Sequence, residues 1–165
     1  MLSWLRSRTQ PRRPGIFSLA EGEMIPYAFQ HYAKDFYEAY KKHKSNQRFS
    51  PARFFLLTRS IELAGKALHA GNGFRNFRKL GHGLKAACKA GVLAKYAITL
   101  TSAEQAELRK ADRYYKVKGF EYYLFSFRGE DGDLSGAQAA LTGWQNLPNE
   151  AVLEAIVEKL LTPQF

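Results

Sequence analysis

The chain has very little cysteine, since Cys88 is the only one among 165 residues. A single thiol excludes a disulfide framework and a zinc site built from cysteines. It also favours a reducing compartment, so we expect a cytoplasmic location. The sequence contains no apolar run near the roughly 18 residues that a membrane-spanning helix needs. We therefore expect no membrane-spanning segment.

Several sequence motifs of enzymes are also missing. The chain has no glycine loop for cradling phosphates, no HExxH zinc pair and no GxSxG nucleophile turn. The turn from Gly129 to Asp133 resembles part of a calcium loop only loosely, because it lacks the distal glutamate. We accordingly expect neither a metal nor a cofactor.

Acidic residues are few relative to basic ones. The 15 Asp and Glu residues stand against 25 Lys and Arg, which gives a formal net charge of +10. Such an excess indicates a polyanionic partner, either a nucleic acid or an anionic membrane surface. Of the two we expect RNA or another phosphate-bearing ligand, and not a membrane.

The first 18 residues differ in composition from the rest of the chain. Within them, residues 1–15 hold four arginines and no acid, which predicts a flexible basic tail that makes non-specific phosphate contacts. Residues 19–165 suffice for a single domain, because hydrophobic residues make up 45% of the chain and aromatic residues 14%. The tail arginines are Arg6, Arg8, Arg12 and Arg13.

Apolar residues recur at helical spacing along this domain. The pattern predicts a first helix from Pro26 to His43 and a second that begins at the Ser50–Pro51 pair and ends at Gly71. A later helix begins at Thr101 or Ser102, where Ser102 and Gln105 form a capping box, and it runs to about Lys116. The last helix follows Asn149.

Two further segments separate these last helices. Residues 120–127 are aromatic and β-prone, and we expect them to pack in an extended form against the helices. A short helix is expected over residues 135–144. Together the elements predict an all-α fold, an antiparallel up-and-down bundle of four to five helices.

A basic stretch from Gly73 to Lys89 is predicted to form the third helix, over residues 75–89. In such a helix five side chains share one stripe, because they follow each other by four, three, three and four residues. Apolar residues fall on another side, which can enter the core. The stripe consists of Arg75, Lys79, His82, Lys85 and Lys89.

His82 is the candidate for chemistry on this stripe. An imidazole titrates near neutral pH, and surrounding cations favour its neutral form, which can act as a base. Basic groups one or two turns away can hold phosphate oxygens and neutralise charge that develops at phosphorus. RNA cleavage without a metal needs such a pair, because a base must take the proton from the attacking 2′-hydroxyl. The alternative interpretation is a solvated basic helix face.

Four segments resemble the HEPN family (higher eukaryotes and prokaryotes nucleotide-binding domains). FLLTRSIELAGKALHA and FRKLGHGLKAACKAG resemble that family's second helix and the start of its third. YYKVKGFEYYLF and NEAVLEAIVEKLL resemble its aromatic segment and its closing helix. Glu62 and Lys66 stand in the family's usual places. The resemblance extends from Phe54 to Leu160, roughly two thirds of the chain.

This resemblance implies an up-and-down HEPN-like bundle that forms a homodimer. Many members of the family are metal-independent RNases whose motif consists of an arginine, a polar residue and a histidine, brought together across the dimer interface. Carried onto this chain, the motif makes Arg75 the phosphate clamp, Asn76 the orienting residue and His82 the general base or acid. The cations expected to guide the RNA backbone are Arg78, Lys79, Lys85 and Lys89.

Three functions stay open at this point. The first is a metal-independent endoribonuclease, as a toxin or defence component. The second is a non-catalytic module that binds RNA, a nucleotide or a partner protein, for example a nucleotidyltransferase. The third is a structural bundle whose segment 120–127 docks another protein.

Overall fold

The computed structural model describes residues 25–45, 50–116, 118 and 147–165. These parts of the chain are helical with turns between them and contain no strand, which confirms the all-α prediction for them. The predicted basic tail, the aromatic segment 120–127 and the helix at 135–144 lie outside the described residues. Of the described helices, none combines the length and apolar character that crossing a bilayer requires.

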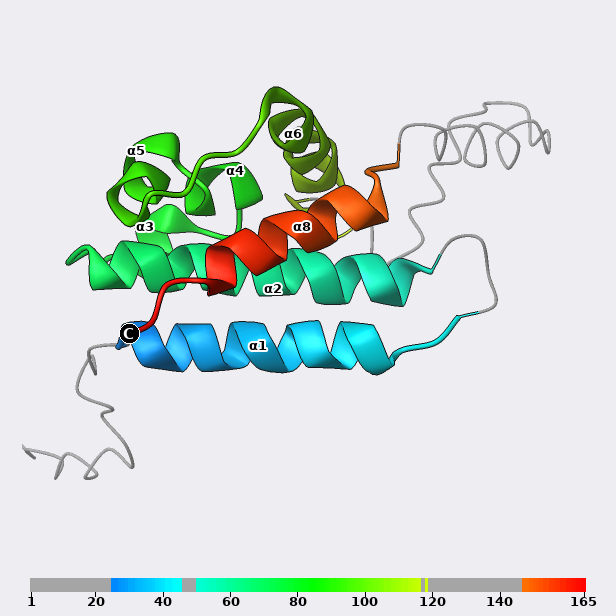
Figure 1. The fold of residues 1–165 in the computed structure, drawn as a ribbon, viewed down its shortest axis with the longest axis horizontal. Coiled ribbons are helices and arrows are strands. Elements are labelled where there is room, and N and C mark those ends of the chain that lie inside the picture. Colours follow the sequence, from blue (N-terminus) through cyan, green and yellow to red (C-terminus); the bar gives the residue numbers. More distant parts are fainter. Residues whose placement is uncertain (1–24, 46–49, 117, 119–146) are drawn as a thin grey trace, which may run out of the picture.

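Helices α1 (Pro26–Lys42) and α2 (Pro51–Gly71) form an antiparallel pair (Figure 1). Each begins with a proline, whose missing N–H is harmless in the first turn. At the start of α2 the Ser50 side chain accepts a hydrogen bond from the backbone N–H of Arg53, as the sequence predicts for an N-cap. These four bounds agree with the sequence prediction to within one residue.

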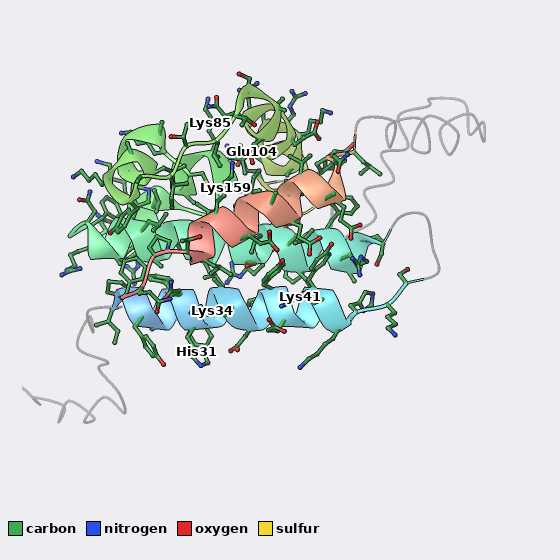
Figure 2. The ribbon with its side chains drawn as sticks, viewed as in Figure 1. His31, Lys34, Lys41, Lys85, Glu104 and Lys159 are labelled. Carbon is green, nitrogen blue, oxygen red and sulfur yellow. The ribbon has the colours of Figure 1, made fainter. Side chains whose placement is uncertain are left out.

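Helix α6 (Ser102–Lys116) lies on the side of α2 away from α1, and helix α8 (Glu150–Leu161) packs against α2 and also contacts α1 (Figure 1). The α8 helix runs in the same direction as α2, and Lys159 joins it to α6 through an ion pair with Glu104 at 2.7 Å (Figure 2). The start of α6 was predicted correctly but its cap was not. Thr101 and Glu104 form the capping box, in which each side chain accepts a hydrogen bond from the backbone N–H of the other.

Because α2 packs against α1, α4 and α8, it is buried over most of its surface. Its residues from Ser60 to Ala70 are all buried, charged ones included. The core around it is built from aliphatic, aromatic and small side chains of every described helix except α3 and the 3-10 turn that follows α5. Its largest fully buried apolar members are Leu57, Ile61, Leu68, Leu84, Leu153, Ile156, Leu160 and Val157.

The prediction of one continuous helix over residues 75–89 is wrong. The structure has three single-turn helices there, α3 (Phe77–Leu80), α4 (Leu84–Ala87) and α5 (Ala90–Leu93), and a 3-10 turn follows them at Ala94–Tyr96. Gly81 ends α3 with φ 67° and ψ −150°, a conformation that is essentially restricted to glycine. The chain changes direction at this glycine, so the side chains of residues 75–89 do not share one helical stripe.

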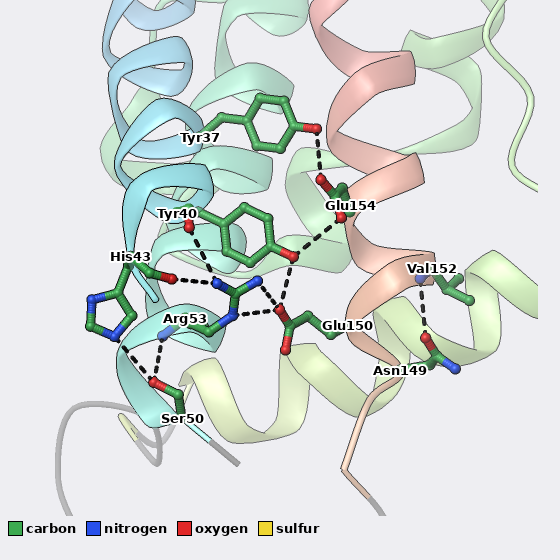
Figure 3. A network of polar contacts seen from close by, with 9 residues as sticks. All are labelled: Tyr37, Tyr40, His43, Ser50, Arg53, Asn149, Glu150, Val152 and Glu154. Carbon is green, nitrogen blue, oxygen red and sulfur yellow. Dashed lines mark hydrogen bonds and ion pairs between the residues drawn. The ribbon is translucent and has the colours of Figure 1, made fainter. Parts of the chain in front are cut away.

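A polar network joins α1, α2 and α8 at one end of the molecule (Figure 3). Arg53 donates to Glu150 at 2.6 Å, and its guanidinium lies over the ring of Tyr40. The hydroxyls of Tyr40 and Tyr37 donate to glutamates of α8, which are Glu150 and Glu154. Burial and these carboxylates raise the pKa of both tyrosines, so the hydroxyls remain donors. The network fixes α8 against the α1–α2 pair.

Helices α2 and α4 approach each other closely at Gly65, which yields a first prediction. A Cβ at this position lies 2.7 Å from the backbone oxygen of Ala87, so Gly65→Ala forces the two helices apart. We expect a loss of about 1–3 kcal/mol in the free energy of unfolding, measured by urea denaturation. Gly91→Ala is the control, because nothing lies within 4 Å of its Cβ. Equal effects of the two variants would contradict the close contact.

Candidate functional site

A buried carboxylate, that of Glu62, organises the most polar part of the core. Its side chain is 0% exposed. One oxygen, Oε1, accepts from Nζ of Lys66 at 2.5 Å and faces Nδ1 of His82 at 2.9 Å. The other, Oε2, accepts from Nη1 of Arg59 at 2.8 Å and from the hydroxyl of Tyr115. Four donors therefore share one carboxylate.

The electrostatics of this cluster follow from burial and from the nearby cations. Burial by itself raises the pKa of Glu62, but hydrogen bonds from Lys66 and Tyr115 and the charges of Lys66 and Arg59 outweigh it. The pKa of Glu62 therefore lies below its ordinary value, and the group is ionised. Burial and the hydrogen bond to this carboxylate raise the pKa of Tyr115, so that its hydroxyl stays protonated and donates.

Three separate segments bring the cluster together. Arg59, Glu62 and Lys66 lie on one side of α2, because steps of three and four residues return to the same face of a helix. Tyr115 comes from the last turn of α6. His82 comes from the turn between α3 and α4, directly after the glycine that ends α3.

The imidazole of His82 lies between this cluster and solvent. A carboxylate can only accept, so Nδ1 of His82 carries the hydrogen and donates to Glu62. The Nε2 atom is left to meet a ligand, and the side chain is 74% exposed. This arrangement differs from the predicted one, in which cations alone surround the ring. A carboxylate orients it instead.

His82 lines an open groove of about 720 Å³, which we call the His82 groove. Its walls combine aromatic rings with basic groups, and Arg78 has no ion-pair partner among the described residues. Among the described residues, no acidic side chain lines this groove, and the Glu62 carboxylate beneath it is 0% exposed. The groove is lined by Phe29, Tyr32, Phe36, Arg59, Leu63, Lys66, Phe77, Arg78, Gly81 and His82.

The two residues predicted to act with His82 do not lie beside its imidazole in this chain. Asn76 is the N-cap of α3, where its side-chain oxygen accepts from the backbone N–H of Lys79 at 3.0 Å. Arg75 donates to the carbonyl of Ala70, near the end of α2. Ala70 lies eight residues after Glu62, a rise of about 12 Å along the helix axis. Within one chain the structure therefore places Arg78, rather than Arg75, in the same groove as His82.

The other predicted cations fall into two groups. Lys79 is exposed on α3, outside the residues that line the His82 groove. Lys85 and Lys89 border a different recess, next to Arg109 of α6. Figure 2 shows Lys85 on the side of the molecule away from α1. The predicted basic stripe is thus divided between two places on the surface.

Sequence reasoning missed the importance of the Glu62–Lys66 pair. It noted only that the two stand where the HEPN resemblance places them, whereas in the structure both are buried and paired with each other. The signal was present, because these charges interrupt a run that is otherwise apolar or small from Ile61 to Leu68. Charged residues in such a run must find partners in the core. Arg59 and Tyr115 are the partners that the pattern could not specify.

Among the described residues, no three side chains of the His, Cys, Asp and Glu types gather in a group that could hold a metal ion. The single thiol, Cys88, is buried, and burial raises its pKa to about 12. A thiol with such a pKa is protonated at neutral pH and is a poor nucleophile.

The buried carboxylate leads to a second prediction. Glu62→Gln removes the charge that compensates Lys66 and Arg59, so we expect a loss of about 3 kcal/mol or more in the free energy of unfolding. Glu38→Gln, which breaks the exposed pair with Lys41, is the matched control and is expected to change it by less than about 1 kcal/mol. Urea denaturation at pH 7 measures both variants, and similar losses in the two would contradict the structure.

The same group predicts a pH dependence. The pKa of Glu62 is lower in the folded chain than its ordinary value of 4.5, so its contribution to stability is present above that value. The contribution is lost as the pH falls through the folded-state pKa. We expect the wild-type chain to lose more stability between pH 6 and pH 3 than Glu62→Gln does. Equal losses of stability in the two proteins over this pH range would show that the pKa of Glu62 is not lowered by folding.

Comparison of the chain with family models, with curated proteins and with solved structures gave no match. The likeness to HEPN domains therefore rests on the sequence segments described above, and the function is argued from the site.

Proposed function

We propose that this chain is a metal-independent endoribonuclease of the HEPN type, with His82 as its general base. The observation that carries the proposal is the hydrogen bond between His82 and the buried Glu62 at the edge of a groove rich in cations and rings. The carboxylate holds the imidazole in one orientation and tautomer, so that Nε2 faces a substrate. Such a pairing prepares a histidine to accept a proton.

The proposed reaction is an intramolecular displacement at phosphorus. Nε2 of His82 takes the proton of a ribose 2′-hydroxyl, and the 2′-oxygen forms a bond to the adjacent phosphorus. The bond from phosphorus to the 5′-oxygen breaks, and this oxygen leaves with a proton from solvent. The products are a 2′,3′-cyclic phosphate and a 5′-hydroxyl end. DNA has no 2′-hydroxyl and is not cleaved.

The groove supplies the other requirements of this reaction. Arg78 is exposed in the groove and can hold two phosphate oxygens through its planar guanidinium. Lys66 and Arg59 add positive charge next to the base and stabilise charge that develops at phosphorus. Tyr32, which is 55% exposed, offers a surface on which a base of single-stranded RNA can stack.

The predicted role of Arg75 is proposed at the level of a homodimer, whereas Asn76 is assigned to capping α3. Arg75 is exposed in the described chain, so a second copy can bring it near the His82 groove of its partner. Lys79, Lys85 and Lys89 are exposed as well and can contact the phosphates of a longer RNA. In this proposal Arg78 clamps the phosphate that reacts.

A non-catalytic module that binds RNA, a nucleotide or a partner protein is the second candidate. One observation favours it: among the described residues, His82 is the only histidine that lines the groove. The proposed cleavage transfers one proton from the nucleophile and another to the leaving group, and a single imidazole supplies one of these at a time. A binding module needs neither transfer.

The experiment that separates the two candidates is cleavage of a labelled single-stranded RNA in the presence of EDTA. We expect His82→Ala to lower the rate at least 100-fold, because general base catalysis typically contributes 10²–10⁴. His31→Ala is the control, since His31 is exposed on α1 and pairs with Asp35. Circular dichroism confirms that both variants are folded. Equal rates for His82→Ala and the wild type would reject the nuclease, and RNA binding without cleavage would support the module.

A fifth prediction concerns Asn76. Because its oxygen caps α3, Asn76→Ser keeps the cap and is expected to retain the wild-type rate within about threefold. Asn76→Ala removes the cap and is expected to destabilise α3 by about 1 kcal/mol. The RNA cleavage assay and a urea titration measure both variants. A strong loss of cleavage in the serine variant, with stability unchanged, would show that the amide takes part in the reaction.

A further inference from the structure

The fold has a second recess, distinct from the His82 groove, between α4, α5 and α6. It has a volume of about 430 Å³, within the usual range of small-molecule sites. Its floor is formed by buried apolar side chains, including Leu93, Ile98 and Leu108. We call it the α4–α6 pocket.

Three cations, Lys85, Lys89 and Arg109, belong to the lining of this pocket and are exposed. No acidic side chain of the described residues pairs with any of them, because the acids of α6 have other partners. Glu107 pairs with Lys110, and Asp112 pairs with Lys116. The pocket thus combines an apolar floor with a basic rim whose charge is not neutralised by the described chain.

The walls of the two recesses indicate different ligands. The His82 groove contains four aromatic rings besides the imidazole, whereas the described residues that line the α4–α6 pocket include no aromatic side chain. The apolar surface of this pocket comes from leucine, isoleucine, alanine and the Cys88 thiol. Aromatic rings favour the stacking of a nucleobase, whereas an aliphatic chain packs well against branched aliphatic groups.

We propose that the α4–α6 pocket binds a small anionic amphiphile, whose unbranched alkyl chain enters the apolar floor. Its carboxylate or phosphate head meets the cations Lys85, Lys89 and Arg109 at the rim. The apolar chain contributes affinity through the area that it removes from water, and the head group selects anions over neutral and cationic molecules. The pocket shares Lys85 and Lys89 with the proposed contacts to a longer RNA but contains neither His82 nor Arg78, so amphiphile binding stands or falls separately from RNA cleavage.

Isothermal titration calorimetry of the full chain with monomeric decanoate tests the proposal. We expect saturable binding of one decanoate per chain and no such binding of decanol or decylamine at the same concentration. Shortening the ligand to octanoate is expected to weaken binding roughly 15-fold, because each buried methylene contributes about fourfold. Decyl phosphate in place of decanoate identifies the preferred head group.

Two variants locate the site. Ala94 lines the pocket and is exposed, so Ala94→Trp is expected to fill the entrance and abolish binding while the fold persists. Ala103→Trp, on the exposed start of α6 and outside the pocket lining, is the control. The double variant Lys85→Gln with Arg109→Gln is expected to weaken decanoate binding at least tenfold. Its control, Lys34→Gln with Lys42→Gln on α1, removes the same charge from exposed positions outside the pocket.

Three results would overturn the proposal. The first is the absence of saturable decanoate and decyl phosphate binding by the wild-type chain. The second is equal weakening by the two double variants, which would indicate a general effect of net charge. The third is binding to phosphatidylglycerol vesicles without binding to the monomeric amphiphiles, which would indicate a surface contact and not a pocket.

Discussion

The burial of one carboxylate constrains this fold more than any other single interaction. A glutamate that is withdrawn from water loses several kcal/mol of hydration unless donors replace the water molecules. Here α2 supplies two cations, α6 supplies a tyrosine and the turn before α4 supplies a histidine. All three segments must be in place before Glu62 is satisfied. The contacts of Glu62 therefore specify how these segments are arranged, while the burial of apolar side chains supplies most of the stabilisation.

The cations of the described chain fall into two kinds, those in ion pairs and those that border the two recesses. Several cations on the surface pair with acids of their own or a neighbouring helix, as Lys159 does with Glu104. Others border the two recesses, where no acidic side chain of the described residues lies opposite them. Arg78 stands in the groove with the aromatic rings, and Lys85 stands at the pocket with aliphatic walls. Similar charges thus occur in two environments that suit different ligands.

The long helices could be read from the sequence, because their signals are local. Proline at the first position, a serine or asparagine cap and apolar spacing suffice for α1, α2 and α8. The turn around Gly81 could not be read in this way, since periodicity continues across a glycine whose left-handed φ appears only in the folded chain. Helix spacing likewise grouped Arg75 with His82, although the two contact α2 about two turns apart.

The candidate site was predictable only in part for a related reason. His82 was singled out by its residue type and its basic neighbours, and these do identify an exposed imidazole in a cationic groove. The orienting partner comes from a different helix, 20 residues earlier in the chain. Which helix lies at the centre of the molecule is a tertiary property, so the spacing of Glu62 and Lys66 alone could not distinguish an exposed pair from a buried one.

Gly81 gives the site an unusual kind of dependence. The imidazole reaches its carboxylate because the preceding residue adopts backbone angles that other amino acids avoid. The orientation of the imidazole thus depends on the backbone of a residue that has no Cβ, as well as on the Glu62 carboxylate that the imidazole contacts. Open space surrounds the position, so steric crowding does not explain the glycine there. An inventory of reactive groups would overlook the residue on which their alignment depends.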